Sequence, residues 1–162
     1  MKEIITNNFR DTQALGKNFA KEIFKREKKK KSAVIIALEG DLGAGKTTFA
    51  QGMAEGLGVK EQITSPTFVL IKKYPIRFQV SRLPKPGTGG QASFKFQDFY
   101  HIDCYRLDKP WQLQELGFEE IINNPENIVA MEWAEKISEI LPEDKITIKF
   151  EWVDENKRKI IF

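Results

Sequence analysis

The sequence contains one cysteine, one histidine and no long apolar run. Cys104 has no second cysteine with which to form an internal disulfide, which is typical of proteins of the reducing cytosol. No segment reaches the ~18 consecutive apolar residues of a membrane-spanning helix. The N-terminal stretch MKEIITNNFR lacks the apolar region of a signal peptide. These absences predict a cytoplasmic protein, and the whole chain, residues 1–162, is expected to form a single domain.

Acidic residues are absent from segment 75–97, which carries the basic residues Arg77, Arg82, Lys85 and Lys95. The formal net charge of the chain is only +3, so the basic excess is concentrated in this segment. The sequence PKPGTGG at 84–90 predicts a loop tip, with 77–83 and 92–99 as hairpin arms on either side. A second basic cluster at 28–31 is better explained as the solvated end of a helix than as an RNA-binding site.

One motif, EGDLGAGKTT at 39–48, predicts a phosphate-binding P-loop, because it satisfies G-x-x-x-x-G-K-[ST]. Six apolar residues at 33–38 have the length of a buried strand, and 48–57 is a plausible amphipathic helix that ends at Gly58. A strand, a glycine-rich loop and a helix N-terminus together present backbone N–H groups to an anion. The motif therefore predicts a nucleoside triphosphate site.

Each residue type in the motif has a chemical reason. Gly40 and Gly45 allow a tight turn and a close approach of backbone to phosphate. Lys46 is expected to reach the β- and γ-phosphates, and Thr47 to place its hydroxyl on Mg²⁺, which prefers hard oxygen ligands. The cofactors implied are ATP or another nucleoside triphosphate and Mg²⁺.

The other patterns predict strands that alternate with helices. A helix is expected from Asp11 to about Lys30, capped by Asn8 or Asp11, with an apolar stripe at Leu15, Phe19 and Ile23. Further elements are strands at 68–74, 98–107 and 128–131, a helix at 113–122 interrupted near Gly117, and a C-terminal antiparallel hairpin of 146–153 with 157–162. The fold class predicted is α/β, with a mixed, largely parallel sheet flanked by helices.

Catalysis by a P-loop enzyme usually also needs a carboxylate at the end of a neighbouring strand. Glu132 follows four apolar residues and fits that place. Asp103 is a second candidate, since strand alternation puts it on one face with His101 and Tyr105. By position alone, each carboxylate could equally be a solvated strand end. The role of His101 stays open, because an isolated strand histidine is more often structural.

Five motifs in order resemble one protein family: GDLGAGKTT, SPTF at 65–68, H-x-D-x-Y-R-L at 101–107, ELGFEE at 115–120 and EW at 132–133. The chain is similar to TsaE proteins, also called the YjeE or YdiB family, from about Thr12 to the final hairpin. The resemblance implies a small cytoplasmic bacterial ATPase that acts with TsaB and TsaD. Their product is the threonylcarbamoyl modification of the adenosine next to the anticodon of tRNAs that read ANN codons. The transfer itself belongs to TsaD.

The resemblance also implies roles for single residues. Lys46, Asp103 and Glu132 would be catalytic, and Thr47 and Glu132 would lie at Mg²⁺. The nucleotide would contact Thr12, Asp41, Leu42, Gly43, Ala44, Gly45, Lys46, Thr47, Thr48, Glu135 and Arg158. A switch-like group would contain Thr64, Ser65, Thr67 and Trp133. A buried indole that fills core volume explains Trp133 equally well, and an exposed hairpin charge is the simpler interpretation of Arg158.

Segment 75–97 departs from the family, because it is longer than the typical loop there by about fifteen to twenty residues, an insertion that costs little closure entropy. Its charge suggests contact with tRNA phosphates or an acidic partner, while a solvated flap is at least as good an explanation. Without such a contact through segment 75–97, the resemblance implies that the chain acts on tRNA only indirectly.

Two other functions stay open. A small-molecule or nucleotide kinase would need an arginine-rich lid, and the chain has only six arginines, of which Arg77 and Arg82 could serve. A nucleotide-gated binding module with negligible hydrolysis would use the same P-loop. A GTPase is disfavoured, since Asn156-Lys157-Arg158-Lys159 fails the last position of N-K-x-D.

Overall fold

A computed structural model describes residues 2–25, 31–77 and 96–162. The predicted loop tip at 84–90, most of the hairpin arms beside it and most of the basic cluster at 28–31 lie outside these ranges.

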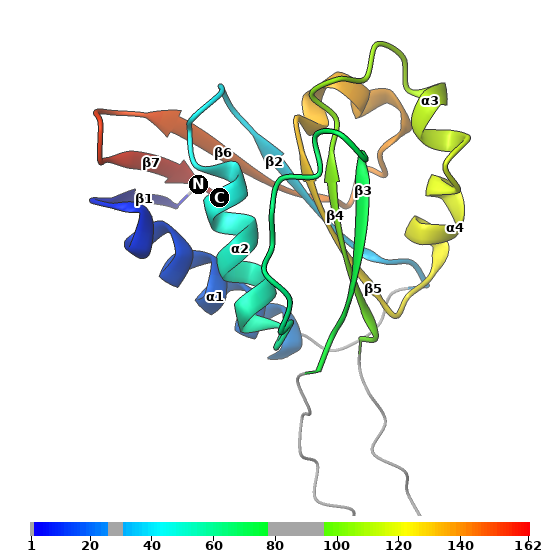
Figure 1. The fold of residues 1–162 in the computed structure, drawn as a ribbon, viewed down its shortest axis with the longest axis horizontal. Coiled ribbons are helices and arrows are strands. Elements are labelled where there is room, and N and C mark those ends of the chain that lie inside the picture. The colour runs from blue at the N-terminus through cyan, green and yellow to red at the C-terminus, as the bar shows by residue number, and fades with distance from the viewer. Residues whose placement is uncertain (1, 26–30, 78–95) are drawn as a thin grey trace, which may run out of the picture.

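The described residues form one seven-stranded sheet, in the order β1-β7-β6-β2-β5-β4-β3 (Figure 1). The strands are β1 Glu3–Thr6, β2 Val34–Glu39, β3 Ile71–Pro75, β4 Asp98–Asp103, β5 Asn127–Glu132, β6 Ile146–Trp152 and β7 Arg158–Ile161. The four middle strands are parallel, since β2 pairs with β5 and β6, and β5 pairs with β4. The outer pairs β1–β7, β6–β7 and β3–β4 are antiparallel. This confirms the predicted mixed α/β sheet.

Helices cover both faces of the sheet (Figure 1). On one face lie α1 Phe9–Lys25 and α2 Lys46–Gly56, over a core that contains Phe49, Ile36 and Phe99. On the other face lie α3 Trp111–Gln114, α4 Phe118–Asn123 and the 3₁₀-helix η1 Ala134–Ile140. There the core contains Cys104, which is fully buried.

The contact between α1 and α2 depends on glycine. A Cβ on Gly16 would lie 2.2 Å from the carbonyl oxygen of Phe49, and a Cβ on Gly52 would lie 2.0 Å from that of Gln13. Any larger residue would push the helices apart, so this close approach fixes α2, and with it the P-loop, against α1. Nothing in the apolar pattern predicted it.

The first helix begins at Phe9, two residues earlier than expected from the sequence. Asn8 caps it, because its side-chain oxygen accepts the backbone N–H of Asp11 at 3.0 Å. The Asp11 carboxylate in turn accepts the N–H of Asn7 at 3.0 Å. The predicted apolar stripe is confirmed, since Ile23 is buried and Leu15 and Phe19 pack against the core.

Several predicted elements have different bounds. The strand expected at 68–74 begins only at Ile71, because a turn comes first: the Pro66 carbonyl accepts the N–H groups of Val69 and Leu70, and Leu70 has a φ of +62°. The extended segment expected at 98–107 ends as a strand at Asp103. The helix at 113–122 is divided in two at Gly117, as predicted. The short edge strand β1 was not predicted, and neither was η1.

Segment 75–97 connects antiparallel strands β3 and β4, with Pro75 opposite Asp98 and the Ile76 N–H donating to the Gln97 carbonyl at 2.7 Å. Its base therefore lies at the amino end of β4. Asp103 lies at the other end of that strand, about 17 Å away at ~3.3 Å per residue.

Candidate active site

The P-loop joins the carboxyl end of β2 to the start of α2, the place where an open α/β sheet binds ligands. Gly40 and Gly45 have φ angles of +136° and +100°, which other residues rarely adopt. A Cβ on Gly40 would also lie 2.2 Å from the Phe150 carbonyl oxygen. Gly45 precedes α2 and gives it no side-chain cap, so the N–H groups of the first turn are left for a ligand.

Lys46, in the first turn of α2, is buried and turned back over the loop. Its ammonium group donates to the carbonyl oxygens of Gly40 and, at 2.8 Å, of Asp41. Burial lowers the pKa of Lys46, and the negative charge of Glu132 opposes that shift most strongly. The lysine thus lies among carboxylates with its charge partly desolvated, where a polyphosphate would interact with it strongly.

Trp133 lies beside Lys46, with its ring centroid 3.9 Å from the Lys46 Nζ. Its backbone is left-handed, with a φ of +59°, and its N–H donates to the Leu38 carbonyl of β2 at 3.1 Å. The ring also packs against Tyr105 at 5.1 Å between centroids. A bulky residue in this backbone conformation is strained, and such strain gathers at functional sites.

Glu132 ends β5 and lies under the P-loop. Both of its carboxylate oxygens are 2.8 Å from the Thr47 hydroxyl, and Oε1 is 2.7 Å from Nε2 of His101. Only 3% of Glu132 and none of His101 is exposed. Three elements, α2, β5 and β4, therefore converge on one carboxylate.

Asp103 is the neighbour of Glu132 across the β4–β5 pair. Its Oδ2 accepts hydrogen bonds from the hydroxyls of Ser65, at 2.9 Å, and Thr67. Its Oδ1 accepts the N–H of Tyr105 at 2.9 Å. The two carboxylates thus hold different partners: Glu132 holds the P-loop helix and Asp103 holds the segment 65–67.

A cavity of about 330 Å³ brings most of the predicted site together. It is lined by Leu42, Gly43, Gly45, Lys46, Thr47, Thr48, Ser65, Thr67, Asp103, Tyr105, Glu132 and Trp133. Thr64 does not line it, and its hydroxyl accepts a hydrogen bond from Lys72 at 2.7 Å. Ala44 is fully buried in the core under the loop.

Arg158 and Thr12 lie on the other flank of the loop. Nε of Arg158 donates to the Gly43 carbonyl at 3.0 Å, so this side chain is tied to the P-loop and does not stand free on the hairpin. Its Nη1 donates to the Asp154 carbonyl at 2.7 Å. The Thr12 hydroxyl is 2.8 Å from that of Thr6, and a Cβ on Gly45 would lie 3.7 Å from the Thr12 methyl group.

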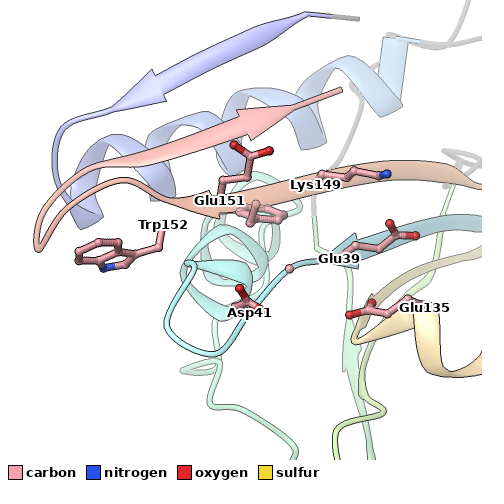
Figure 2. Close-up of a pocket in the computed structure, with 8 residues that line it drawn as sticks. Glu39, Asp41, Glu135, Lys149, Glu151 and Trp152 are labelled. Carbon is pink, nitrogen blue, oxygen red and sulfur yellow. The ribbon is translucent and has the colours of Figure 1, made fainter.

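A second cavity, of about 540 Å³, lies between the P-loop and β6 (Figure 2). Four of its eight lining residues are acidic, and the full lining is Glu39, Gly40, Asp41, Glu135, Lys149, Phe150, Glu151 and Trp152. Figure 2 shows the Glu135 carboxylate, from η1, in this group beside the strand that leads into the loop. Asp41 and Glu135 therefore line a different cavity from Lys46 and Thr47, and the P-loop lines both cavities.

The donor set suits Mg²⁺ bound together with a nucleotide. In the ranges that the structure describes, no three His, Cys, Asp or Glu side chains gather as a protein-only metal site. Magnesium in triphosphate sites instead takes one or two protein oxygens and completes its octahedron with phosphates and water. The Thr47 hydroxyl and the Glu132 carboxylate are hard oxygen donors that already touch at the mouth of the P-loop, so they fit this ion.

Sequence reasoning missed the contacts of His101 and the hydroxyl pair of Thr6 and Thr12. For His101 the available signal was its place two residues before Asp103 on the same strand face.

Of the helices in the described ranges, none is long and apolar enough to cross a membrane.

Comparisons with known proteins identify the family. The family model described as "Threonylcarbamoyl adenosine biosynthesis protein TsaE" matches residues 6–160. A protein named "tRNA threonylcarbamoyladenosine biosynthesis protein TsaE" from Haemophilus influenzae is 34% identical over 140 residues, which covers 86% of this chain and 75% of the relative. The protein of the same name from Rickettsia prowazekii is 36% identical, over 94% of this chain and 88% of its own length.

Among solved structures, the crystal structure of YdiB from Bacillus subtilis is similar with a TM-score of 0.63 and 31% sequence identity. The alignment covers 98% of this chain and 82% of that one. The likeness therefore extends over the whole sheet and not only over the P-loop.

Proposed function

The chain belongs to the TsaE family, and from that premise we propose that it is a magnesium-dependent ATPase. The ATPase supports threonylcarbamoyl modification of the adenosine next to the anticodon of ANN-decoding tRNAs, together with TsaB and TsaD in the cytoplasm. The observation that carries the proposal is the contact of the Thr47 hydroxyl with both oxygens of Glu132, directly under the P-loop. A phosphate-binding turn alone would need no such pair.

In this proposal the P-loop binds the triphosphate. The loop N–H groups from Asp41 to Thr48 surround the phosphates, and the N-terminus of α2 adds its positive dipole end. Lys46 exchanges its two carbonyl partners for phosphoryl oxygens. Thr12 and Arg158 would support the loop on its nucleoside side, and Glu135 would approach from the acidic cavity.

Thr47 and Glu132 would hold Mg²⁺, which supplies a positive charge to the phosphate oxygens. The reaction proposed is in-line attack of water on the γ-phosphorus, with a new P–O bond to water and cleavage of the bond to the bridging β–γ oxygen. ADP leaves, and the proton of the water passes to the phosphate produced. Lys46 and the loop N–H groups stabilise the charge on the transferring group.

Asp103 would orient the attacking water, since it faces the same cavity. Among the described residues, its Oδ1 accepts only the Tyr105 N–H and keeps a place for the water, while Oδ2 holds Ser65 and Thr67. Release of these two hydroxyls from Oδ2 would free the segment that carries them. Segment 64–67 would move at that step, which gives the switch-like residues their role. We expect slow hydrolysis by the isolated protein, and faster hydrolysis when a partner favours the released state.

The test is phosphate release from Mg-ATP by this protein, alone and with TsaB and TsaD of the same source. Slow release that rises several-fold with the pair supports the proposal. The absence of both stimulation and association contradicts it. The products also separate the alternatives. A kinase yields a phosphorylated small molecule, whereas a nucleotide-gated binding module yields neither that product nor free phosphate.

A further inference from the structure

His101 is the least explained polar residue near the site. It lies in β4 between its register partners Lys72 and Ala130, and none of it is exposed. Nε2 is within hydrogen-bond distance of Glu132, whereas Nδ1 has no partner in the described part of the chain. A buried polar atom without a partner costs stability that an apolar residue would not. Packing therefore does not account for histidine here, and the bond to Glu132 has to.

The Glu132 carboxylate has two positively polarised neighbours that compete for it. One is the Thr47 hydroxyl at 2.8 Å. The other is the Lys46 ammonium, because Glu132 raises the pKa of Lys46 more than the other carboxylates around it do, against the lowering by burial. In the described residues Lys46 and Glu132 form no ion pair; Lys46 instead donates to the backbone carbonyls of the loop.

A direct Lys46–Glu132 ion pair would disable both groups. Lys46 would lose its charge for phosphates, and Glu132 would turn away from Thr47. His101 opposes this rotation because it binds Oε1 from β4, a strand that neither Lys46 nor Thr47 belongs to. With Oε1 held by His101, the carboxylate stays against the Thr47 hydroxyl.

We propose that His101 is a positioning residue that fixes Glu132 beside Thr47, and thereby sets how strongly Mg²⁺ and ATP bind together. The inference rests on the proposed function, since it takes Thr47 and Glu132 as the magnesium ligands. Groups that orient metal ligands typically change metal affinity 10- to 100-fold when they are removed.

The experiment compares His101→Leu, which removes the bond, with His101→Gln, whose amide N–H can replace Nε2. The measured quantity is the ratio of ATP dissociation constants without and with saturating Mg²⁺, by titration calorimetry. We expect His101→Leu to reduce this ratio roughly tenfold while ATP affinity in EDTA stays within about twofold, and His101→Gln to recover most of the loss.

Ile102→Val is the matched control, because Ile102 is equally buried on the same strand but faces the core that contains Cys104. Its ratio should equal that of the unchanged protein. If His101→Leu does not fold, His101→Asn replaces it, since its shorter amide does not reach Oε1. The inference is overturned if the ratio is unchanged in His101→Leu, or if His101→Gln is no better than His101→Leu.

The proposed function is tested separately, by phosphate release from the unchanged protein. Binding that is magnesium-dependent and sensitive to His101 supports the inference even if no hydrolysis is found. A ratio of one in the unchanged protein removes Glu132 from the metal site and overturns the inference.

Discussion

Lys46 and Trp133 form a cation–π pair, with the ammonium nitrogen 3.9 Å from the ring centroid. The lysine starts α2 and the tryptophan follows β5, so the pair joins the P-loop to the neighbouring strand. The left-handed backbone of Trp133 directs its ring to this position. In the proposed function, ATP would draw the ammonium toward the phosphates and away from the ring.

Lys46→Ala should abolish tight ATP binding. The charged hydrogen bonds that it removes contribute about 1.5–3 kcal/mol each, so the dissociation constant should rise at least tenfold in titration calorimetry. Lys46→Arg keeps the charge and is the control for the shape of the site. Normal affinity in Lys46→Ala would contradict the assignment of the P-loop.

The sequence predicted those parts of the site whose chemistry is local. The spacing from Gly40 to Thr47 located the loop, and the apolar run before Glu132 located that carboxylate at a strand end. Sequence reasoning failed where a contact depends on the order of strands. Arg158 reaches Gly43 because the predicted C-terminal hairpin joins the sheet through the pairing of β6 with β2, which no local pattern in the chain encodes. The bond of His101 to Glu132 similarly required the β4–β5 register.

Glu132→Gln should keep nucleotide binding and lose magnesium-dependent hydrolysis. The amide is the same size and keeps an oxygen for Thr47, but it carries no charge for a cation. Phosphate release at limiting Mg²⁺ should fall at least tenfold, and added Mg²⁺ should restore part of the loss. An unchanged rate under those conditions would remove Glu132 from the site.

Arg158→Ala should weaken ATP binding by loosening the P-loop. The change removes the bond to the Gly43 carbonyl and the bond to the turn at Asp154. At about 1 kcal/mol for such a bond, we expect a three- to tenfold rise in the ATP dissociation constant. Arg158→Lys keeps the charge but not the two-pronged geometry, so it should resemble Arg158→Ala. Wild-type affinity in Arg158→Lys would show that only the charge matters.

Cys104 should make the fold less stable in alkaline solution. Burial raises the pKa of its thiol from 9.0 to about 12, so the unfolded chain loses the proton at a lower pH than the folded one. Since the folded state then binds more protons, its free energy of unfolding falls as pH rises from about 9 toward 12. Urea denaturation of Cys104→Ala should show a shallower fall between pH 8 and pH 10.5 than that of the unchanged protein, at most by ~1.4 kcal/mol per pH unit. Equal slopes would place the thiol in contact with water.

Segment 75–97 provides the last prediction. Its base, at Ile76 and Gln97, lies at the end of β4 remote from Asp103, so removing its tip should leave ATP hydrolysis by the isolated protein unchanged. If its basic residues contact tRNA phosphates, deletion of 84–90 together with neutralisation of Arg82 should weaken binding to the tRNA-bound complex of TsaB and TsaD. The affinity should then also fall less steeply between 50 and 200 mM salt, because fewer counterions are released on binding. A control deletion of 86–90, which keeps both Arg82 and Lys85, separates charge from loop length. An unchanged affinity and salt slope in the deletion with neutralised Arg82 would show that the segment is a solvated flap.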